Sequence, residues 1–373
     1  MDTLEIIRQF ALEGNPTEVK PLGNGLINDT FKVSTDGAKS YVLQRINNAI
    51  FRDVDLLQHN IDAVTRHIRA KLEAAGESDI DRKVLTFVPL KGSDKTYWTD
   101  GQTYWRVSVF IPDAFTYEAV TPEYSYYAGK AFGRFEAMLT DIPEKLGETI
   151  PDFHNMELRA RQLHEAIEAD AAGRLAKPEV KALVEEVLKY EEEMTLAERL
   201  HREGKLPKRI CHCDTKVNNM MFDANGNVLC VIDLDTVMPS YVFSDFGDFL
   251  RTAANFTAED DPDSRKVGFN MEIFKAFSKG YLESASSFLT PVEKENLPYA
   301  ACLFPYMQCV RFLADYINGD TYYKIKYPEH NWDRTVNQWE LFKSAKAHVP
   351  EMKNWPALPG TPAAPDKSKI GLE

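Results

Sequence analysis

Residues 209–237 read RICHCDTKVNNMMFDANGNVLCVIDLDTV, and this stretch decides the fold. A short apolar run leads into the polar segment 214–218, and two further apolar runs flank the dipeptide Asn225-Gly226. Asn-Gly between two such runs is the strongest short-range signal of a β-hairpin. We therefore predict two antiparallel strands joined by a two-residue turn.

The open end of this hairpin gathers oxygen-bearing side chains. In the predicted register Asn219 lies opposite Ile232, which is the neighbour of Asp233, and Asp214 leads into the same end. A carboxylate and an amide carbonyl are hard oxygen ligands suited to Mg²⁺. A further carboxylate can take or orient the proton of an attacking hydroxyl. Asp214, Asn219 and Asp233 are thus the groups that phosphoryl transfer requires.

Composition limits the class of protein. The chain has 373 residues, of which 44% are hydrophobic, so it can fill a core. With 44 Lys+Arg and 57 Asp+Glu its net charge is -13, which disfavours nucleic acid and anionic membranes as partners. Five cysteines without paired spacing, no signal-peptide pattern and no apolar run of membrane-spanning length predict a cytoplasmic protein. Nothing in the sequence indicates an oligomeric state.

The first part of the chain, 1–111, is predicted to be a β-rich lobe. Val54–Ala74 has apolar residues at helical spacing, and Thr3–Leu12 is a second, shorter helix. The predicted strands are Thr30–Thr35, Ser40–Ile46, Lys83–Val88, Thr96–Trp98 and Thr103–Ile111.

The second part, 112–350, is mainly helical and contains the hairpin. Its predicted helices are Pro122–Leu139, Met156–Asp170, Pro178–Glu203, Ser244–Asn255, Met271–Ser284, Glu293–Ile317 with interruptions at Pro298 and Pro305, and Trp332–His348. Residues 351–373 are rich in Pro, Ala and Gly and are predicted to form a flexible tail. A small β-rich lobe before a large helical lobe with an inserted catalytic hairpin predicts an α+β, protein-kinase-like, two-lobed fold.

The spacing His212-x-Asp214-x4-Asn219, followed by a strand that ends in Ile232-Asp233, resembles the motifs of the aminoglycoside phosphotransferase and choline kinase superfamily. In those enzymes the Asp of the first motif is the base or orienter for the substrate hydroxyl, and the Asn and the later Asp hold Mg²⁺. The resemblance implies these roles for Asp214, Asn219 and Asp233.

Other polar residues of this region have structural interpretations. Acidic residues at the end of a hairpin are often solvated turn residues. His212 lies in an apolar strand and is predicted to hydrogen-bond the backbone of the catalytic segment rather than to act as a base. Asp235 is expected to assist either the metal site or the fold. Asp245 and Asp248 precede a helix, and we interpret them as caps of that helix.

A glycine-containing loop, PLGNGLINDTFKV, precedes the second predicted strand and is an expected nucleotide-binding loop. Backbone amides approach phosphates closely where glycines stand. Gly23, Gly25, Asn28 and Thr30 are its candidate residues. The chain has no Walker A pattern, and the loop by itself is equally typical of a plain β-turn.

The expected phosphate-binding lysine is missing. Kinase folds place a cation for the phosphates on the strand that here reads Tyr41-Val42-Leu43-Gln44-Arg45. Gln44 stands at that position, and alternation puts Arg45 on the opposite face. Either the strand shifts and Arg45 serves, or the protein manages without this cation.

Over roughly residues 3–345 the sequence is similar to the N-acetylhexosamine 1-kinases. The resemblance implies ATP-dependent phosphorylation of the anomeric hydroxyl of N-acetylglucosamine or N-acetylgalactosamine, with Arg311 and Tyr322 as sugar contacts. Leu26 departs from that family, which can carry a histidine there. The shared stretches are FALEG, GNGLINDTF, YVLQRIN, DTKVNN, IDLDTVMP, DFGD and RFLADYINGDTYYKIKYPEHN.

Arg311 and Tyr322 also have structural interpretations. Arg311 could pair with Asp315 one helical turn away, and Tyr322 could belong to the core. The sequence as a whole predicts a Mg²⁺- and ATP-dependent sugar kinase. The alternatives are a kinase for another hydroxyl compound (aminoglycoside, choline or ethanolamine, homoserine-like), a metal-dependent phosphohydrolase, and a nucleotide-binding regulator without turnover, which Gln44 would suggest.

Overall fold

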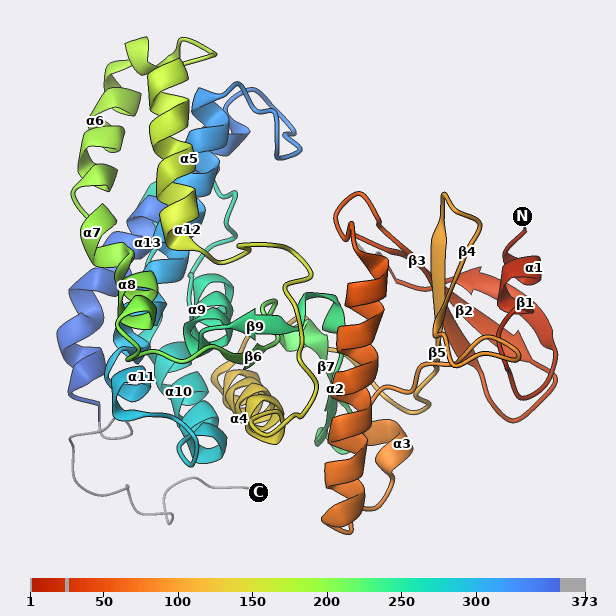
Figure 1. Ribbon diagram of the computed structural model, residues 1–373. Coiled ribbons are helices and arrows are strands. Elements are labelled where there is room, and N and C mark those ends of the chain that lie inside the picture. The colour runs from red at the N-terminus through yellow and green to blue at the C-terminus, as the bar shows by residue number, and fades with distance from the viewer. Residues whose placement is uncertain (1, 24–26, 356–373) are drawn as a thin grey trace. The chain divides into compact units, whose positions relative to one another are not determined.

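The structure is a computed structural model, and it describes residues 2–23 and 27–355. The chain forms two compact units. The first comprises the chain up to Glu118 with Met138–Pro151 and Asn218–Pro239, and the second comprises Ala119–Ala137, Asp152–Val217 and the chain from Ser240 onward. An antiparallel sheet in the first unit and helices in the second confirm the predicted α+β, protein-kinase-like class (Figure 1).

A five-stranded antiparallel sheet with the order β1-β2-β3-β5-β4 forms the centre of the first unit. Because side chains alternate along a strand, the two faces of this sheet differ. Leu43 lies opposite Val107 on the core face, and both are fully buried. Gln44 lies opposite Arg106 on the other face. The strands are β1 Pro16–Pro21, β2 Asp29–Thr35, β3 Tyr41–Ile46, β4 Tyr97–Thr99 and β5 Tyr104–Val109.

Three α-helices lie in the described part of the first unit. The longest, α2, spans Val54–Ala74 as predicted. Its buried Asn60 donates hydrogen bonds to the carbonyls of Gly147 (2.8 Å) and Val237 (3.0 Å), so α2 anchors the segment that follows the hairpin. The short helices are α1 Thr3–Ile7 and α3 Ile80–Lys83.

The predicted hairpin is present as β7 Met220–Phe222 and β8 Val228–Val231. Met220 pairs with Val231, which is the predicted register. The Ile232 N–H continues that register by donating to the Asn219 carbonyl at 2.9 Å.

The turn of the hairpin differs from the prediction. The N–H of Asp223 donates to the Asn227 carbonyl at 2.9 Å, so the loop has three residues, 224–226, and not two. Its last residue, Gly226, has φ +80°, the left-handed conformation that three-residue loops require. A register shift between Met221 and Phe222 takes up the extra residue, and therefore the open end keeps the predicted pairing.

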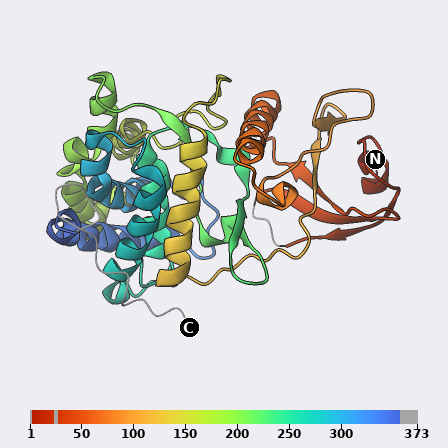
Figure 2. The ribbon, with the colours of Figure 1, turned by 90° about the horizontal axis from the view of Figure 1, so that it is seen from below.

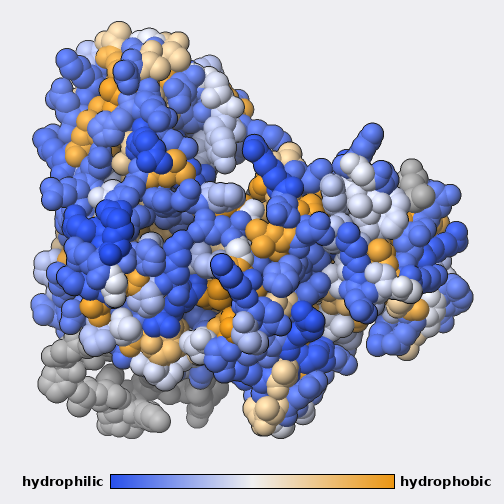
Figure 3. Space-filling view, in the orientation of Figure 1, coloured by the Kyte–Doolittle hydropathy of each residue, from blue (hydrophilic) through white to orange (hydrophobic). Residues whose placement is uncertain are grey.

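The second unit consists mainly of helices, and the face of it seen in Figure 3 is mostly hydrophilic. Among the described residues no helix combines the length and the apolar character that crossing a membrane requires. The helices are α4 Pro122–Met138, α5 Met156–Ala169, α6 Pro178–Leu188, α7 Glu191–Met194, α8 Leu196–Arg202, α9 Val242–Ala253, α10 Met271–Ala285, α11 Pro291–Glu295, α12 Leu297–Ile317 and α13 His330–Lys353.

Short elements complete the chain. Strand β6 (Arg209–Cys211) precedes the predicted catalytic segment, which carries Asp214, and β9 (Met238–Ser240) follows the predicted metal-binding segment, which carries Asp233. The 3₁₀ helices are η1 Arg174–Ala176, η2 Val217–Asn219, η3 Leu234–Thr236 and η4 Ser264–Lys266.

Glycines let helices of the second unit approach closely. A Cβ atom at Gly280 would lie 2.0 Å from the Tyr126 carbonyl oxygen, so α10 packs directly on α4 (Figure 2). A Cβ atom at Gly247 would lie 2.5 Å from the Ala300 carbonyl oxygen. The glycine of the DFGD stretch therefore seats α9 against α12.

Several predicted elements were wrong. Lys83–Val88 is not a strand: α3 ends at Lys83, and Phe87 makes only a single bridge to Ser108. The predicted helix at 178–203 is divided into α6, α7 and α8. Pro305 does not interrupt α12. Strand β1 was not predicted.

The predicted tail begins too early, because α13 continues to Lys353. The remainder of that prediction, residues 356–373, lies outside the described residues.

Candidate active site

The catalytic segment follows β6 in the second unit, and two carboxylates of α9 hold its backbone. Asp245 accepts hydrogen bonds from the N–H groups of His212 (2.9 Å) and Cys213 (2.7 Å). Asp248 accepts one from the Thr215 N–H (3.1 Å). Cys213 has φ +63°, a conformation that costs free energy and persists where its surroundings fix it. Both aspartates lie inside α9 rather than before it, so their interpretation as helix caps was wrong.

Asp214 lies in this held segment, beside a lysine that we did not single out in the sequence. Its carboxylate is 2.6 Å from the ammonium of Lys216. Burial by itself lowers the pKa of Lys216, but Asp214 more than offsets this, and the pKa of Lys216 is raised above its ordinary value. Lys216 is therefore a cation fixed beside the proposed base.

His212 supports Asp214 through the backbone. The N–H of Asp214 lies 3.3 Å from His212 Nδ1, which accepts it. The imidazole is fully buried and meets the rings of Phe132 and Phe135 edge to face. These contacts fit a histidine that positions the catalytic segment.

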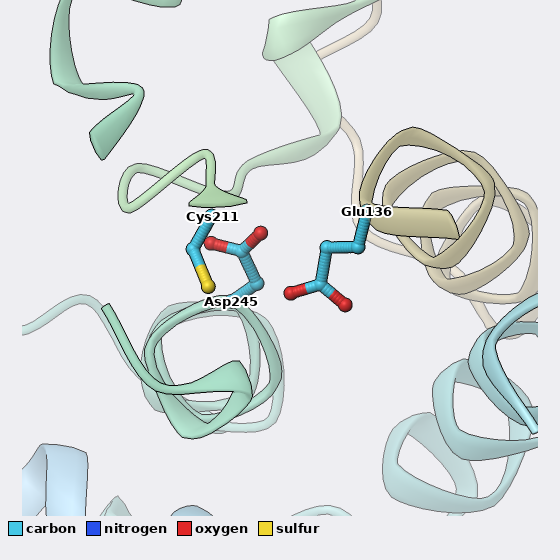
Figure 4. A group of neighbouring side chains, drawn as sticks. All are labelled: Glu136, Cys211 and Asp245. Atoms are coloured by element: carbon cyan, nitrogen blue, oxygen red, sulfur yellow. The ribbon is translucent and has the colours of Figure 1, made fainter. Parts of the chain in front are cut away.

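In the described part of the chain, one group of three potential metal ligands lies close together. It consists of Glu136, Cys211 and Asp245 (Figure 4). Each member already has a partner. Glu136 accepts a hydrogen bond from the Tyr281 hydroxyl (2.5 Å), and Cys211 Sγ donates to the Tyr241 carbonyl (3.3 Å). The cluster thus joins α4, α9 and β6 behind the catalytic segment and supports that segment instead of forming a metal centre.

The buried carboxyl groups of this region have raised pKa values. Burial, followed by the nearby Asp245, raises the pKa of Glu136 well above its usual range. Burial also raises the pKa of Asp245, and it raises that of Asp248 to about 6. The segment that carries Asp214 is therefore held by carboxyl groups that protonate more readily than exposed ones.

The predicted metal ligands belong to the first unit, at the open end of the hairpin. Asn219 is buried, and its carbonyl accepts the Ile232 N–H. Asp233 follows directly and has φ +59°, so the chain leaves β8 by a left-handed turn. The chain crosses from the second unit to the first between Val217 and Asn218, which places Asp214 in one unit and both predicted metal ligands in the other.

Asp235 stands two residues beyond Asp233 and is buried. Its carboxylate pairs with the guanidinium of Arg106 at 2.5 Å and accepts a hydrogen bond from the Asn28 side chain at 2.6 Å. Asn28 closes the glycine-containing loop, of which Gly25 and Leu26 lie outside the described residues. Gly23 has φ +69°, which favours glycine.

The two candidates on β3 point to opposite faces of the sheet. Gln44 donates to the Thr30 hydroxyl (3.2 Å) and accepts from Arg106 Nε (2.9 Å). Arg45 lies beside Asp29 at 3.7 Å, and about half of its side chain is exposed. The strand keeps a regular register with both neighbours, so no shift brings Arg45 to the face of Gln44.

The predicted sugar contacts line a pocket of about 490 Å³ in the second unit, between α5, α12 and the segment after α12. Arg311 donates to the Gln308 side chain (3.2 Å) and stacks on Tyr323. Arg311 makes no ion pair with Asp315, and Tyr322 is 75% exposed, so neither structural interpretation of these two residues was right.

Arg159 is a second guanidinium in the pocket, and the sequence did not reveal it. It donates to the Phe153 carbonyl at 2.7 Å. Burial, and then the charge of Arg311, lower the pKa of Arg159 to about 10. Burial, and then the charge of Arg311, also lower the pKa of the neighbouring His154 well below its usual value. The pocket is therefore cationic through its arginines, whereas its histidine neighbour is neutral at neutral pH.

Hydrogen bonds and the ion pair of Arg106 thus join Asn28, Thr30, Gln44 and Asp235 in the first unit. Asn219 and Asp233 meet at the hairpin end of the same unit. Asp214, Arg311 and Tyr322 lie in the second unit. The residues that the sequence did not single out are Arg106, Lys216 and Arg159, whereas Asp245 and Asp248 were singled out for a different role.

Comparison with known proteins supports the fold and assigns a family. The model of the phosphotransferase enzyme family matches residues 18–277. Among solved structures, an aminoglycoside phosphotransferase from Alicyclobacillus acidocaldarius is 12% identical, with a TM-score of 0.58, and the match covers 94% of this chain and 97% of that one. An amicoumacin kinase solved with AMP-PNP, Ca²⁺ and its substrate is 15% identical, with a TM-score of 0.56 and coverage of 95% and 94%. The Plasmodium vivax ethanolamine kinase is 14% identical, with a TM-score of 0.51 and coverage of 92% and 86%.

Proposed function

Because this chain belongs to the phosphotransferase enzyme family, we propose that it transfers the γ-phosphate of ATP to the anomeric hydroxyl of an N-acetylhexosamine, either N-acetylglucosamine or N-acetylgalactosamine. The observation that carries the choice of acceptor is the arginine-lined pocket of the second unit. Its charge has the wrong sign for most of the substrates named for the similar structures.

Aminoglycosides and ethanolamine carry amino groups that are protonated at neutral pH, and such groups need carboxylates as partners. The pocket instead offers Arg159 and Arg311. One of its carboxylates, Asp315, is already engaged by the backbone N–H groups of Thr321 (2.9 Å) and Tyr322 (2.8 Å). The arginines would therefore repel a cationic substrate. The other carboxylate of the lining, Glu165, lies at the exposed rim of the pocket.

A neutral N-acetylated sugar fits the same groups. Guanidinium groups donate hydrogen bonds and accept none, so they suit ring hydroxyl oxygens and an acetamide carbonyl. Tyr322, which is largely exposed, offers an apolar ring face and a polar tip. Arg311 and Tyr322 are hence the proposed sugar contacts, and Arg159 is added to them.

Asp214 is the proposed base and orienter. Its carboxylate accepts the proton of the anomeric hydroxyl, whose oxygen forms a bond to the γ-phosphorus while the bond from that phosphorus to the bridging oxygen of ADP breaks. Lys216, 2.6 Å from Asp214, holds the carboxylate in place and adds positive charge near the transferred group.

The residues present suit a divalent cation. Asn219 and Asp233 supply an amide oxygen and a carboxylate, the hard oxygen donors that Mg²⁺ takes while it leaves positions for phosphate. When bound, Mg²⁺ offsets the negative charge of the phosphate oxygens. The left-handed turn at Asp233 and the pairing of Asn219 with Ile232 set these two donors on either side of the hairpin end.

The proposed nucleotide-binding residues are Gly23, Gly25, Asn28, Thr30 and Gln44, with Arg45 as a further candidate.

All five cysteines are buried free thiols, which supports a reducing, cytoplasmic location. ATP and a small sugar are then the partners of the protein.

The experiment is ADP release from Mg²⁺-ATP by the purified chain, measured with and without N-acetylglucosamine and N-acetylgalactosamine. We expect sugar-dependent release that disappears in Asp214→Asn. Arg311→Gln should raise the KM for the sugar about tenfold and leave that for ATP unchanged, because one charged hydrogen bond is lost. Release stimulated by an aminoglycoside or ethanolamine, and not by either sugar, would show that the acceptor is wrong.

A further inference from the structure

The first unit contains a buried ion pair that joins the sheet to the segment carrying Asp233. The Arg106 side chain is 3% exposed and that of Asp235 is 5% exposed. Their charged groups are 2.5 Å apart. A buried ion pair of this kind adds little net stability, because desolvation offsets most of the attraction. We therefore looked for a role of this ion pair other than stabilising the fold.

The register of the sheet gives Arg106 its place. Thr30, Gln44 and Arg106 lie directly opposite one another on β2, β3 and β5, and so they share one face. Hydrogen bonds connect them in a row: Gln44 donates to Thr30 and accepts from Arg106. Gln44, on the strand where a lysine was expected, is therefore hydrogen-bonded to an arginine on the neighbouring strand β5.

The other side of the pair reaches the glycine-containing loop. Asp235 accepts from the Asn28 side-chain amide at 2.6 Å, and Asn28 accepts from the Asn47 N–H at 2.9 Å. The Asp235 carbonyl accepts from the Thr149 hydroxyl at 2.9 Å. Asp235 is in this way fixed from three directions, two residues from Asp233.

Kinase folds use a lysine on the third strand, paired with a carboxylate, to align the phosphates with the metal. We propose that the Arg106–Asp235 pair is the corresponding positioning device of this protein, and that it aligns the end of the glycine-containing loop and the Asp233 turn for the phosphates of the nucleotide. The cation has moved from β3 to β5, and its carboxylate partner comes from the metal-binding segment. This inference rests on the proposed use of a nucleotide.

The hydrogen bonds of the Arg106 guanidinium are only partly used within the protein. Arg106 Nε donates to Gln44, and Nη1 faces Asp235. Within residues 2–23 and 27–355, the buried Nη1 makes no hydrogen bond, although it lies 2.5 Å from Asp235. Two other lysines lie on this face: Lys32 is over the ring of Phe110 at 4.1 Å, and Lys20, opposite Lys32 on β1, pairs with Glu18 at 2.8 Å. Arg106 is consequently the basic residue of this face that is connected to Gln44, Thr30, Asp235 and Asn28.

The test compares Mg²⁺-ATP binding, by calorimetry, and initial rates for six variants of the full chain, among them Arg106→Met alone and Arg45→Gln. Arg106→Gln removes the charge, Arg106→Lys keeps it, and Arg106→Met/Asp235→Leu removes both charges with apolar groups of similar size. Such a replacement often preserves stability. Lys32→Gln is the matched control, since it removes a charge from the same face outside the network.

We expect Arg106→Gln and the double variant to weaken Mg²⁺-ATP binding and to raise the KM for ATP about tenfold or more, with the KM for the acceptor within about twofold. Arg106→Lys should recover most of the loss, and Lys32→Gln should equal wild type. The two residues act as one unit, so Asp235→Leu should add nothing further to Arg106→Met.

A double variant with a wild-type melting temperature and wild-type ATP binding would overturn the proposal. If the double variant does not fold, equal ATP binding by Arg106→Gln and Arg106→Lys would overturn it instead. A tenfold loss in Lys32→Gln or Arg45→Gln, with none at Arg106, would also do so by placing the cation elsewhere. Wild-type protein that binds no Mg²⁺-ATP would refute the proposed function and this inference together, whereas binding without stimulation by either sugar would refute the acceptor alone.

Discussion

The segment that carries Asp214 and the segment that carries Asp233 are both held by buried aspartates, but by opposite means. In the second unit Asp245 accepts two backbone N–H groups, has Glu136 beside it, and forms no ion pair with any described residue. In the first unit Asp235 is itself part of the held segment and faces the guanidinium of Arg106. Asp245 thus has a carboxyl group beside it and no ion-pair partner, although the second carboxylate that holds this segment, Asp248, lies 3.7 Å from Arg251. Asp235, in contrast, is itself one half of a close pair of opposite charges.

This difference has a physical consequence. Carboxyl groups buried together have raised pKa values, so the support of the Asp214 segment depends on pH. A pair of opposite charges depends instead on the presence of both partners, because removal of one leaves the other buried and uncompensated. Mutations and pH should therefore affect the two segments differently.

The largest effect is expected at the metal-binding segment. Asp233→Ala removes the charged oxygen donor of the proposed metal site, and the Mg²⁺-dependent part of nucleotide binding should disappear. Titration of nucleotide binding with Mg²⁺ measures this. Asp223→Ala, in the turn of the same hairpin, is the control and should retain the titration. An unchanged Mg²⁺ titration in Asp233→Ala would refute the ligand assignment.

Asp214→Asn should come next. The substitution keeps the shape of the side chain but replaces one acceptor oxygen by an amide donor and removes the base. The kcat should therefore fall by at least about 100-fold while ATP binding is retained. Steady-state rates and a separate binding titration distinguish the two quantities. Near-normal turnover would remove Asp214 from its proposed role, and the Asp214 segment would then have only a structural function.

A smaller effect is expected from the support of the Asp214 segment. Asp245→Ala leaves the N–H groups of His212 and Cys213 without an acceptor in a buried place, which should cost about 3 kcal/mol of unfolding free energy. Asp245→Asn keeps one oxygen acceptor and should cost less. Urea unfolding of both variants provides the comparison. Equal losses in the two variants would mean that these hydrogen bonds are not what holds the segment.

The smallest effect is the pH dependence. The pKa of Asp248 is raised to about 6, so between about pH 4 and 6 the folded state binds more protons than the unfolded state. Stability should accordingly fall as pH rises through that window. Asp248→Asn has no proton to release and should show a shallower decline. Urea unfolding at several pH values tests this, and parallel curves for the two proteins would contradict it.

The fold was largely predictable because its signals are local. Apolar residues at helical spacing gave α2 its bounds, and the pattern around Asn225-Gly226 gave the hairpin and the register at its open end. Errors arose where local pattern competes with neighbours. The segment 83–88 has strand-like residues but finds only a single bridge, and Pro305 fits inside α12 because tertiary packing overrides its local preference.

The candidate site was predictable only in part. Asp214, Asn219 and Asp233 stand at fixed spacings around a hairpin, so the sequence alone was enough to nominate them. Lys216 follows Asp214 by two residues and could have been found by asking which cation lies beside the base. Asp245 and Asp248 were assigned to the wrong role, because their partners are backbone groups more than 30 residues away in the chain.

The sequence by itself determined the fold class, the hairpin and the residues at its open end, since these depend on local periodicity and turn chemistry. Only the tertiary structure decided that Arg106 meets Asp235, and that Arg159 joins Arg311 in one pocket. The reason is that strand pairing and helix packing bring together side chains whose distance in the chain carries no information about their distance in space. A missing lysine on one strand can be read from the sequence, but the arginine opposite it appears only once the sheet is formed.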